Sequence, residues 1–165
     1  MILRATKVSL ILAVALFYTF VVFNNLTDYD TNYQFVRHVL MMDSTVPGNH
    51  GVWRALNGSR WHTAFYVGII TWECAVMLLC WAGGWQLVRQ ISAPAAAFER
   101  AKRVAISALG LALLMWLLAF LSIGGEWFLM WQSKTWNGEP AAFRMFTVIG
   151  IVLVLLVQPE VHPQS

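Results

Sequence analysis

Four long runs of apolar residues divide the chain, with polar segments of unequal length between them. A helix needs about 20 mostly apolar residues to cross the hydrocarbon core of a bilayer. The runs lie at about residues 5–23, 62–87, 104–130 and 143–157. None has an interior proline, so each can form a continuous helix. The pattern predicts an all-α integral membrane protein, a four-helix transmembrane bundle in which residues 1–165 form a single membrane domain.

The polar connection between the first two runs, residues 24–61, is long enough to hold structure of its own. Thr31 followed by Gln34 has the spacing of a capping box. Three apolar positions then fall on one helix face: Tyr33, Val36 and Leu40. We expect a helix from residue 32 to about 43 that lies on the membrane surface or caps the bundle. This connection is therefore expected to be a partly helical extracytoplasmic loop.

Basic residues predict the orientation of the helices. They gather before the first run and in the connection at residues 88–103: Arg4, Lys7, Arg89, Arg100, Lys102 and Arg103. By the positive-inside rule, this connection and both termini face the cytoplasm. The first run lacks the small residues of a signal-peptide cleavage site at its end, so we expect an uncleaved helix. The chain is then a multi-pass protein of the bacterial inner membrane.

Composition supports a membrane environment. Hydrophobic residues make up 59% of the chain and charged residues only 12%, against about 25% charged in an average soluble domain. The formal net charge of +3 is small and scattered, so we expect no nucleic-acid partner. Cys74 and Cys80 lie about 9 Å apart along one predicted helix, too far to form a disulfide. We expect the lipid bilayer as the main partner, bound lipid, and no other cofactor.

Most of the nine tryptophans lie at the predicted membrane boundaries, as in an aromatic belt at headgroup level. A second interpretation concerns the outer boundary, where three tryptophans follow Glu126: Trp127, Trp131 and Trp136. Indole rings offer apolar area and a hydrogen-bond donor. These tryptophans are therefore candidate ligand-binding residues, with lipid or quinone as the ligand.

Glu73 is the only carboxylic acid in the apolar stretch "GIITWECAVMLLC" at residues 68–80. It lies about 16 Å from the outer end of its helix, near the middle of the membrane. An ionised carboxylate is costly there, so we expect a neutral side chain that joins helices through a hydrogen bond. The candidate partners are Thr19, Ser122, Thr147 and Trp116. A proton- or ion-handling role and a contact with another subunit are the alternatives.

Glu126 lies near the outer end of the third predicted helix, and Arg144 enters the fourth at a similar height. We expect a structural ion pair between them, with Arg60 and Arg37 of the outer loop as alternative partners for the carboxylate.

His38, Met41 and Met42 have the i, i+3, i+4 spacing that directs three side chains along one side of a helix. Imidazole and thioether ligands suit Cu(I), and His50 or His62 would complete such a site. The interpretation that we favour is that the methionines fill an apolar face.

Two segments carry a resemblance to a known family. "NNLTDYDTNYQFVRHVLMMD" after the first run and "GGEWFLMWQSKTWNG" at the end of the third resemble the bacterial small integral membrane proteins grouped as a domain of unknown function. The four-span layout is similar too, so the resemblance covers nearly the whole chain. It implies the fold class and a bacterial inner-membrane location, and it implies no activity.

The sequence contains no Walker loop, GxGxxG or HExxH motif, so we expect no enzyme. Ala5, Ser9 and Ala13, spaced by four, favour close packing of the first helix, within the bundle or between protomers. The leading hypothesis is a structural or accessory subunit that forms a homo-oligomer or joins other inner-membrane subunits. The alternatives are a small transporter or channel component that uses Glu73, and a protein that binds lipid, quinone or copper at its outer face.

Overall fold

The structure is a computed structural model, which describes residues 1–160. Four helical segments in this range are long and apolar enough to cross a membrane. They are α1 (Ile2–Thr27), α3 (Ser59–Arg89), α4 (Ala95–Leu114) with its continuation η2 (Met115–Trp127), and α5 (Glu139–Val157). Residues 1–160 contain no β-strand. The predicted all-α fold with four membrane helices is confirmed.

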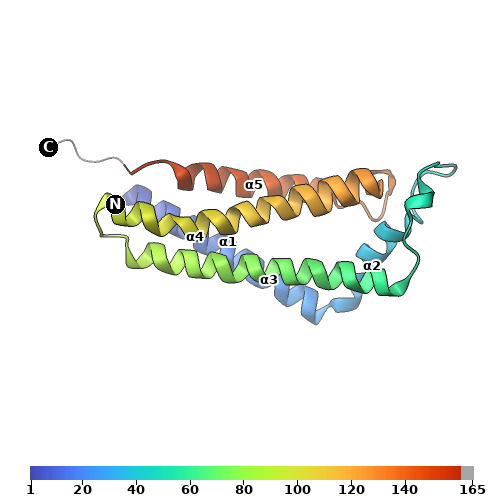
Figure 1. The fold of residues 1–165 in the computed structure, drawn as a ribbon, viewed down its shortest axis with the longest axis horizontal. Coiled ribbons are helices and arrows are strands. Elements are labelled where there is room, and N and C mark those ends of the chain that lie inside the picture. The colour runs from blue at the N-terminus through green and yellow to red at the C-terminus, as the bar shows by residue number, and fades with distance from the viewer. Residues whose placement is uncertain (161–165) are drawn as a thin grey trace.

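The four segments pack side by side in a bundle (Figure 1). The α3 helix packs against α1 on one side and α4 on the other, and α5 packs against α4 and η2, with a smaller contact to α1. The N-terminus, the connection from α3 to α4 and the C-terminal end of α5 lie at one end of the bundle. We call this the basic end. The opposite end, which carries α2 and the longer loops, is called the cap end.

The cap is built on α2 (Tyr29–Met41), with the 3-10 turns η1 (Val52–Arg54) and η3 (Met130–Gln132) nearby. The predicted apolar face packs toward α3, because Val36 and Leu40 are buried in one cluster with Tyr66 of α3. The connection is therefore partly helical, as predicted, and its helix covers the bundle.

The start of α2 differs from the prediction. The α1 helix continues to Thr27, and only Asp28 separates it from α2. The Asp28 N–H still donates to the carbonyl of Asn24 (2.8 Å), so the chain turns within one residue. Thr31 and Gln34 consequently lie inside α2, and the predicted capping box does not form.

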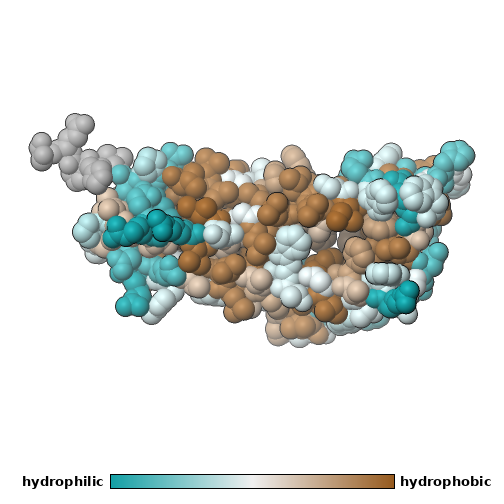
Figure 2. Space-filling view, viewed as in Figure 1, coloured by the Kyte–Doolittle hydropathy of each residue, from teal (hydrophilic) through white to brown (hydrophobic). Residues whose placement is uncertain are grey.

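The surface between the two ends is apolar. Figure 2 shows a band of hydrophobic side chains between two more hydrophilic ends. Exposed large apolar residues occur on each of the membrane helices, with Phe20, Leu78, Leu118 and Ile151 as examples. Exposure of such residues on all sides is unfavourable in water and favourable in hydrocarbon. The chain is an integral membrane protein, and the bilayer is the solvent of this surface.

The last part of the third membrane segment is π-helical, over Met115–Trp127. A backbone hydrogen bond between residues five apart lies at its end, where the Phe128 N–H donates to the Ile123 carbonyl (2.9 Å). π-Helical turns are rare and occur often at functional sites. Phe120, near the middle of this stretch, contributes to the cavity described below.

One close backbone approach fixes how α3 and α4 pack. A Cβ atom added to Gly83 would lie 2.7 Å from the Ala105 backbone nitrogen and 2.8 Å from its Cα. Backbone atoms cannot move aside as the end of a flexible side chain can. Gly83 therefore permits a helix–helix distance that a larger residue would not.

We predict that Gly83→Ala lowers the free energy of unfolding by about 1–3 kcal/mol through overpacking at the α3–α4 contact. Gly68→Ala on the same helix is the matched control, because its added Cβ would meet nothing within 4 Å. Thermal unfolding of both variants in the same detergent checks the prediction. Equal midpoints for the two variants would contradict it.

Candidate functional site

Glu73 lies in α3 and is 3% exposed. Asn25, near the end of α1, donates a hydrogen bond from Nδ2 to Glu73 Oε2 (2.6 Å). The Tyr66 hydroxyl in turn donates to Asn25, with its oxygen 3.0 Å from the backbone carbonyl and 3.2 Å from Oδ1. A carboxylate, an amide and a phenol thus form one chain of hydrogen bonds between α1 and α3.

The helical register of α3 brings Tyr66 and Glu73 together. They are seven residues apart, which places both side chains on one face of the helix. Ile70 lies between them on this face and is also buried. This spacing is the sequence signal that could have identified Tyr66 as a neighbour of Glu73.

The expected partners of Glu73 are wrong, because all four hydrogen-bond elsewhere. Thr19, Ser122 and Thr147 donate to carbonyl groups of their own helices, and Trp116 donates to the Tyr18 hydroxyl (2.9 Å). The reason is the length of α1. Because this helix continues past the apolar run to Thr27, it brings the amide of Asn25 to Glu73.

Glu73 lies near the middle of α3, with 14 residues of the helix before it and 16 after it. Leu87, which is near the basic end of α3, is about 21 Å from Glu73 along the helix axis. At the height of Glu73, α1 is ending and α2 begins to cover the bundle. Glu73 therefore lies at the level where the cap begins to cover the bundle.

A cavity of about 260 Å³ lies beside Glu73, between α1, α2, α3 and η2. Part of its lining is polar: Asn24, Asn25, Asn32, Tyr66 and Glu73. The other part is apolar: Val21, Phe35, Val36, Ile69 and Phe120. No lysine or arginine lines this cavity. Its charge is therefore set by one carboxyl group.

The second oxygen of this carboxyl group, Oε1, accepts no hydrogen bond from the described residues, whereas Oε2 accepts that of Asn25. Among residues 1–160, every side-chain nitrogen or oxygen that is sealed from solvent has a hydrogen-bond partner. Oε1 is therefore accessible, and the cavity that Glu73 lines is the space to which it opens. A buried side chain thus presents one free acceptor to the cavity.

A smaller apolar hollow of about 40 Å³ adjoins this cavity and shares four lining residues with it: Phe35, Val36, Ile69 and Phe120. It continues toward Phe65 of α3 and Ala119 of η2. Phe65 is 36% exposed on the surface that faces lipid. An apolar hollow therefore lies next to the polar cavity, on the side of Phe65.

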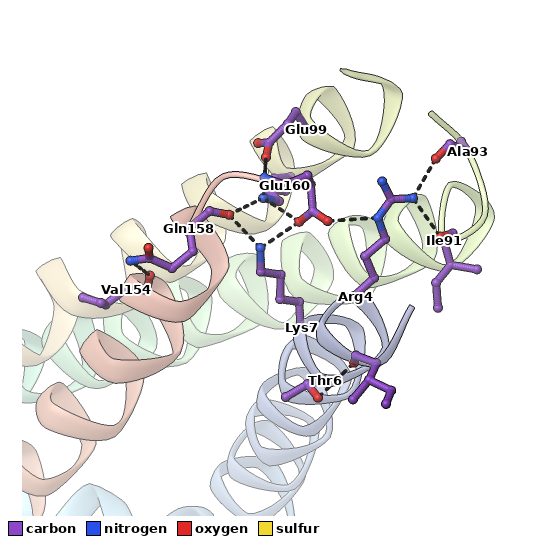
Figure 3. A network of polar contacts seen from close by, with 11 residues as sticks. Arg4, Thr6, Lys7, Ile91, Ala93, Glu99, Val154, Gln158 and Glu160 are labelled. Carbon is purple, nitrogen blue, oxygen red and sulfur yellow. Dashed lines mark hydrogen bonds and ion pairs between the residues drawn. The ribbon is translucent and has the colours of Figure 1, made fainter. Parts of the chain in front are cut away.

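A second polar cluster closes the basic end (Figure 3). Lys7 and Lys102 are each 1% exposed, and both donate to the Gln158 carbonyl (2.6 and 2.8 Å). The carboxylate of Glu160 pairs with Arg4 (2.9 Å), Lys7 (2.7 Å) and Lys102 (3.1 Å). We call these residues the basic-end network.

Further bonds extend the basic-end network. Arg4 Nη1 donates to the carbonyls of Ile91 (3.0 Å) and Ala93 (2.6 Å) in the connection from α3 to α4. Glu99 accepts from Lys102 and from the Glu160 backbone N–H. Burial alone would raise the pKa of Glu160, but hydrogen bonds from Lys7, Arg4 and Lys102 outweigh it and hold this pKa at about 2. The network has the character of a structural clamp.

The expected ion pair at the cap end is wrong for the part of the chain that the structure describes. Glu126 and Arg144 are both exposed, and neither takes part in a salt bridge within residues 1–160. Glu126 instead lines a shallow depression together with Glu139 and Phe143. The prediction relied on a similar height of the two residues in the membrane, but both side chains are exposed and do not pair.

The three candidate tryptophans do not form one cluster. Trp127 contacts Trp53 edge to face, with ring centroids 6.0 Å apart, and the Arg54 guanidinium lies 5.3 Å from the centroid of Trp127. Trp136 stacks on His38 at 4.6 Å with nearly parallel rings. Trp131 is half exposed. Each tryptophan therefore has its own surroundings at the cap end.

His38 and the neighbouring methionines are placed differently from one another. The His38 Nδ1 atom lies 2.6 Å from Asp43 Oδ2, and its ring is stacked on Trp136. Met42 is 3% exposed and belongs to the apolar cluster beneath the cap, while Met41 is partly buried. In residues 1–160, no group of three or more His, Cys, Asp or Glu side chains is placed to hold a metal ion.

Comparison with known proteins identifies the class of the chain. Residues 3–159 match the family described as predicted small integral membrane protein (DUF2165). The chain belongs to this family, which confirms the resemblance drawn from the two quoted segments. No curated protein and no solved structure matches the chain. The family description assigns no activity, so function has to be argued from the geometry.

We predict that Asn25→Ala lowers the free energy of unfolding by about 1–3 kcal/mol, because Glu73 loses its donor and Tyr66 loses one of its acceptors. Asn24→Ala is the matched control, since Asn24 is the exposed neighbour in the same helix. Thermal unfolding in detergent measures both. An Asn24 variant as unstable as the Asn25 variant would mean that the hydrogen bond to Glu73 is not the cause.

For the basic-end network, we predict that Glu160→Gln costs about 3 kcal/mol of stability, because two buried lysines lose their carboxylate. The pKa of Glu160 is about 2 in the fold against an ordinary 4.5. Because this pKa is lower in the fold than its ordinary value, the ionised carboxylate stabilises the fold. This stabilisation is complete above about pH 5 and is lost as the pH falls from 4.5 toward 2. The difference in unfolding midpoint between wild type and variant should narrow over this range.

Thermal unfolding at pH values from 2 to 7 measures this difference, with Glu126→Gln as the exposed-carboxylate control. A difference that does not change with pH would contradict the proposed source of the stability.

Proposed function

We propose that this small integral membrane protein is a non-enzymatic subunit of a membrane assembly, in which α1 packs against a second chain. We further propose that it is inserted in the bacterial inner membrane with its basic end in the cytoplasm. The orientation is supported by the positive-inside rule, since exposed Arg89, Arg100 and Arg103 lie at the basic end.

The observation that carries this proposal is the position of the small-residue stripe on α1. Ala5, Ser9 and Ala13 are all exposed, while Val8, Ile11 and Ala15 form the buried face of the same helix. The stripe therefore does not serve packing inside the bundle. Small residues at intervals of four allow the backbone of another membrane helix to approach closely, and a second copy of the chain is the partner that we favour.

A subunit role also fits the way in which the polar side chains of the membrane helices are used. Thr6, Thr19, Thr71 and Thr147 each donate to a carbonyl of their own helix. The basic-end network acts as a clamp rather than as a reaction centre. These polar groups stabilise the fold. Their use in structural contacts supports a protein that acts by binding other membrane proteins.

A second candidate function is a small transporter or channel component that uses Glu73 as its protonatable group. The observation that favours it is the free Oε1 atom of a buried carboxyl group at a cavity of about 260 Å³. It ranks second because this cavity also suits a bound ligand.

We predict that native mass spectrometry of the protein, extracted gently from its membrane, gives a small multiple of the 18.6 kDa chain mass or a complex with other subunits. Ser9→Leu should shift the distribution toward single chains, because the larger side chain prevents close approach. Ser107→Leu is the control, an exposed serine on α4 outside the stripe. A wild-type protein that is always a single chain without partners would overturn the proposal.

A further inference from the structure

The hydrogen bond that joins Glu73 to Asn25 leaves the other oxygen of the Glu73 carboxyl group without a partner among the described residues. The side chain is 3% exposed, and only one of its two oxygens accepts a hydrogen bond from the described residues. No salt bridge within residues 1–160 involves it. An ionised carboxylate in such a place needs a donor or a cation at its second oxygen.

We propose that this cavity binds an amphiphilic amine, with the ammonium group at Glu73 Oε1 and the apolar part against Phe35, Phe120 and the adjoining hollow. This inference concerns a ligand and does not depend on the proposed subunit role.

The polar side of the cavity suits an ammonium group. Besides Glu73, the side chains of Asn24 and Asn32 reach its lining, and an amide oxygen can accept an N–H bond. No cationic side chain lines the cavity to repel a positive ligand. Because Asn25 already donates to Oε2, Oε1 remains as the acceptor for the ligand.

The aromatic side of the cavity suits a cation with an attached hydrocarbon. Phe35, Tyr66 and Phe120 contribute rings to the lining, and a ring face attracts an ammonium group within about 6 Å of its centroid. The same rings offer apolar area to a hydrocarbon chain. A single site can therefore recognise both parts of an amphiphilic amine.

The size of the cavity limits what it can enclose. Sites for drug-sized ligands have volumes of about 300–1,000 Å³, and this cavity has about 260 Å³. It has room for a head group and a few carbons. The remaining hydrocarbon would follow the hollow between Ile69 and Phe120 toward Phe65, which is exposed to lipid.

Two sources can supply this chemistry: a membrane lipid with an ammonium head group, or a free amphiphilic amine that partitions into the bilayer. The ammonium group and its apolar attachment are common to both, so binding is tested first with a simple probe and the source is tested afterwards.

The probe is octylammonium chloride, added to the purified protein in dodecyl maltoside and phosphate buffer without other amines. 1-Octanol is the uncharged control. We expect a saturable rise in the thermal unfolding midpoint with octylammonium and no saturable rise with octanol. An equal effect of octanol would overturn the proposal, because Glu73 would then not be recognising a cation.

Two variants locate the probe in the cavity. Glu73→Gln keeps the shape of the side chain and removes its charge, and Ile69→Trp fills the cavity while leaving the Glu73–Asn25 hydrogen bond in place. Each should weaken octylammonium binding by at least about tenfold. Glu126→Gln, an exposed carboxylate outside the cavity, should bind as wild type does. Wild-type affinity in both cavity variants would overturn the proposal, and the Ile69 variant decides the matter if the Glu73 variant fails to fold.

Native mass spectrometry of the protein from its own membrane then distinguishes the sources. Retention of phosphatidylethanolamine by wild type and its loss from Glu73→Gln would support a lipid head group. Octylammonium binding to wild type without a retained lipid would support a free amphiphilic amine. A lipid retained equally by both proteins, together with no octylammonium binding, would overturn the proposal.

Discussion

Lys7 and Lys102 cannot remain charged inside the bundle without partners, and this constraint organises the basic end. Both donate to the Gln158 carbonyl and the Glu160 carboxylate. A charge withdrawn from water is costly unless it is paired and hydrogen-bonded. The solution found here joins α1, α4 and the residues that follow α5 at one point. Through Arg4, which also pairs with Glu160, the connection that follows α3 is held at the same place.

With the basic end joined in this way, the lengths of the helices decide what meets at the cap end. The α1 helix runs on to Thr27, and its last turns place Asn25 against Glu73 in α3. The α2 helix follows after a single residue and covers this contact. The π-helical turns of η2 bring Phe120 to the same place. The cavity is thus formed where four segments of different length meet, and its one carboxyl group comes from α3.

The fold could be predicted from the sequence because its dominant signal is local. A continuous apolar run specifies a membrane helix whatever its neighbours are. The buried face of α2 was predictable for the same reason, since Val36 and Leu40 repeat at helical spacing. The end of α1 was not predictable, because Asn24, Asn25 and Thr27 are residue types that are common in loops, although here they continue a helix. That one misassignment also hid the partner of Glu73. Contacts between distant segments, such as Lys7 with Glu160, depend on the rotation of each helix, which the sequence pattern leaves open.

The separation of Lys7 from Glu160 has a consequence for biogenesis. These two residues lie 153 positions apart, at the beginning and the end of the described chain. During translation, Lys7 leaves the ribosome long before its carboxylate partner has been made. Until then, the first helix must keep this ammonium group hydrated at the membrane surface. Final seating of α1 in the bundle is therefore a late step of assembly, because it waits for the synthesis of Glu160 and does not follow the order in which the helices are made.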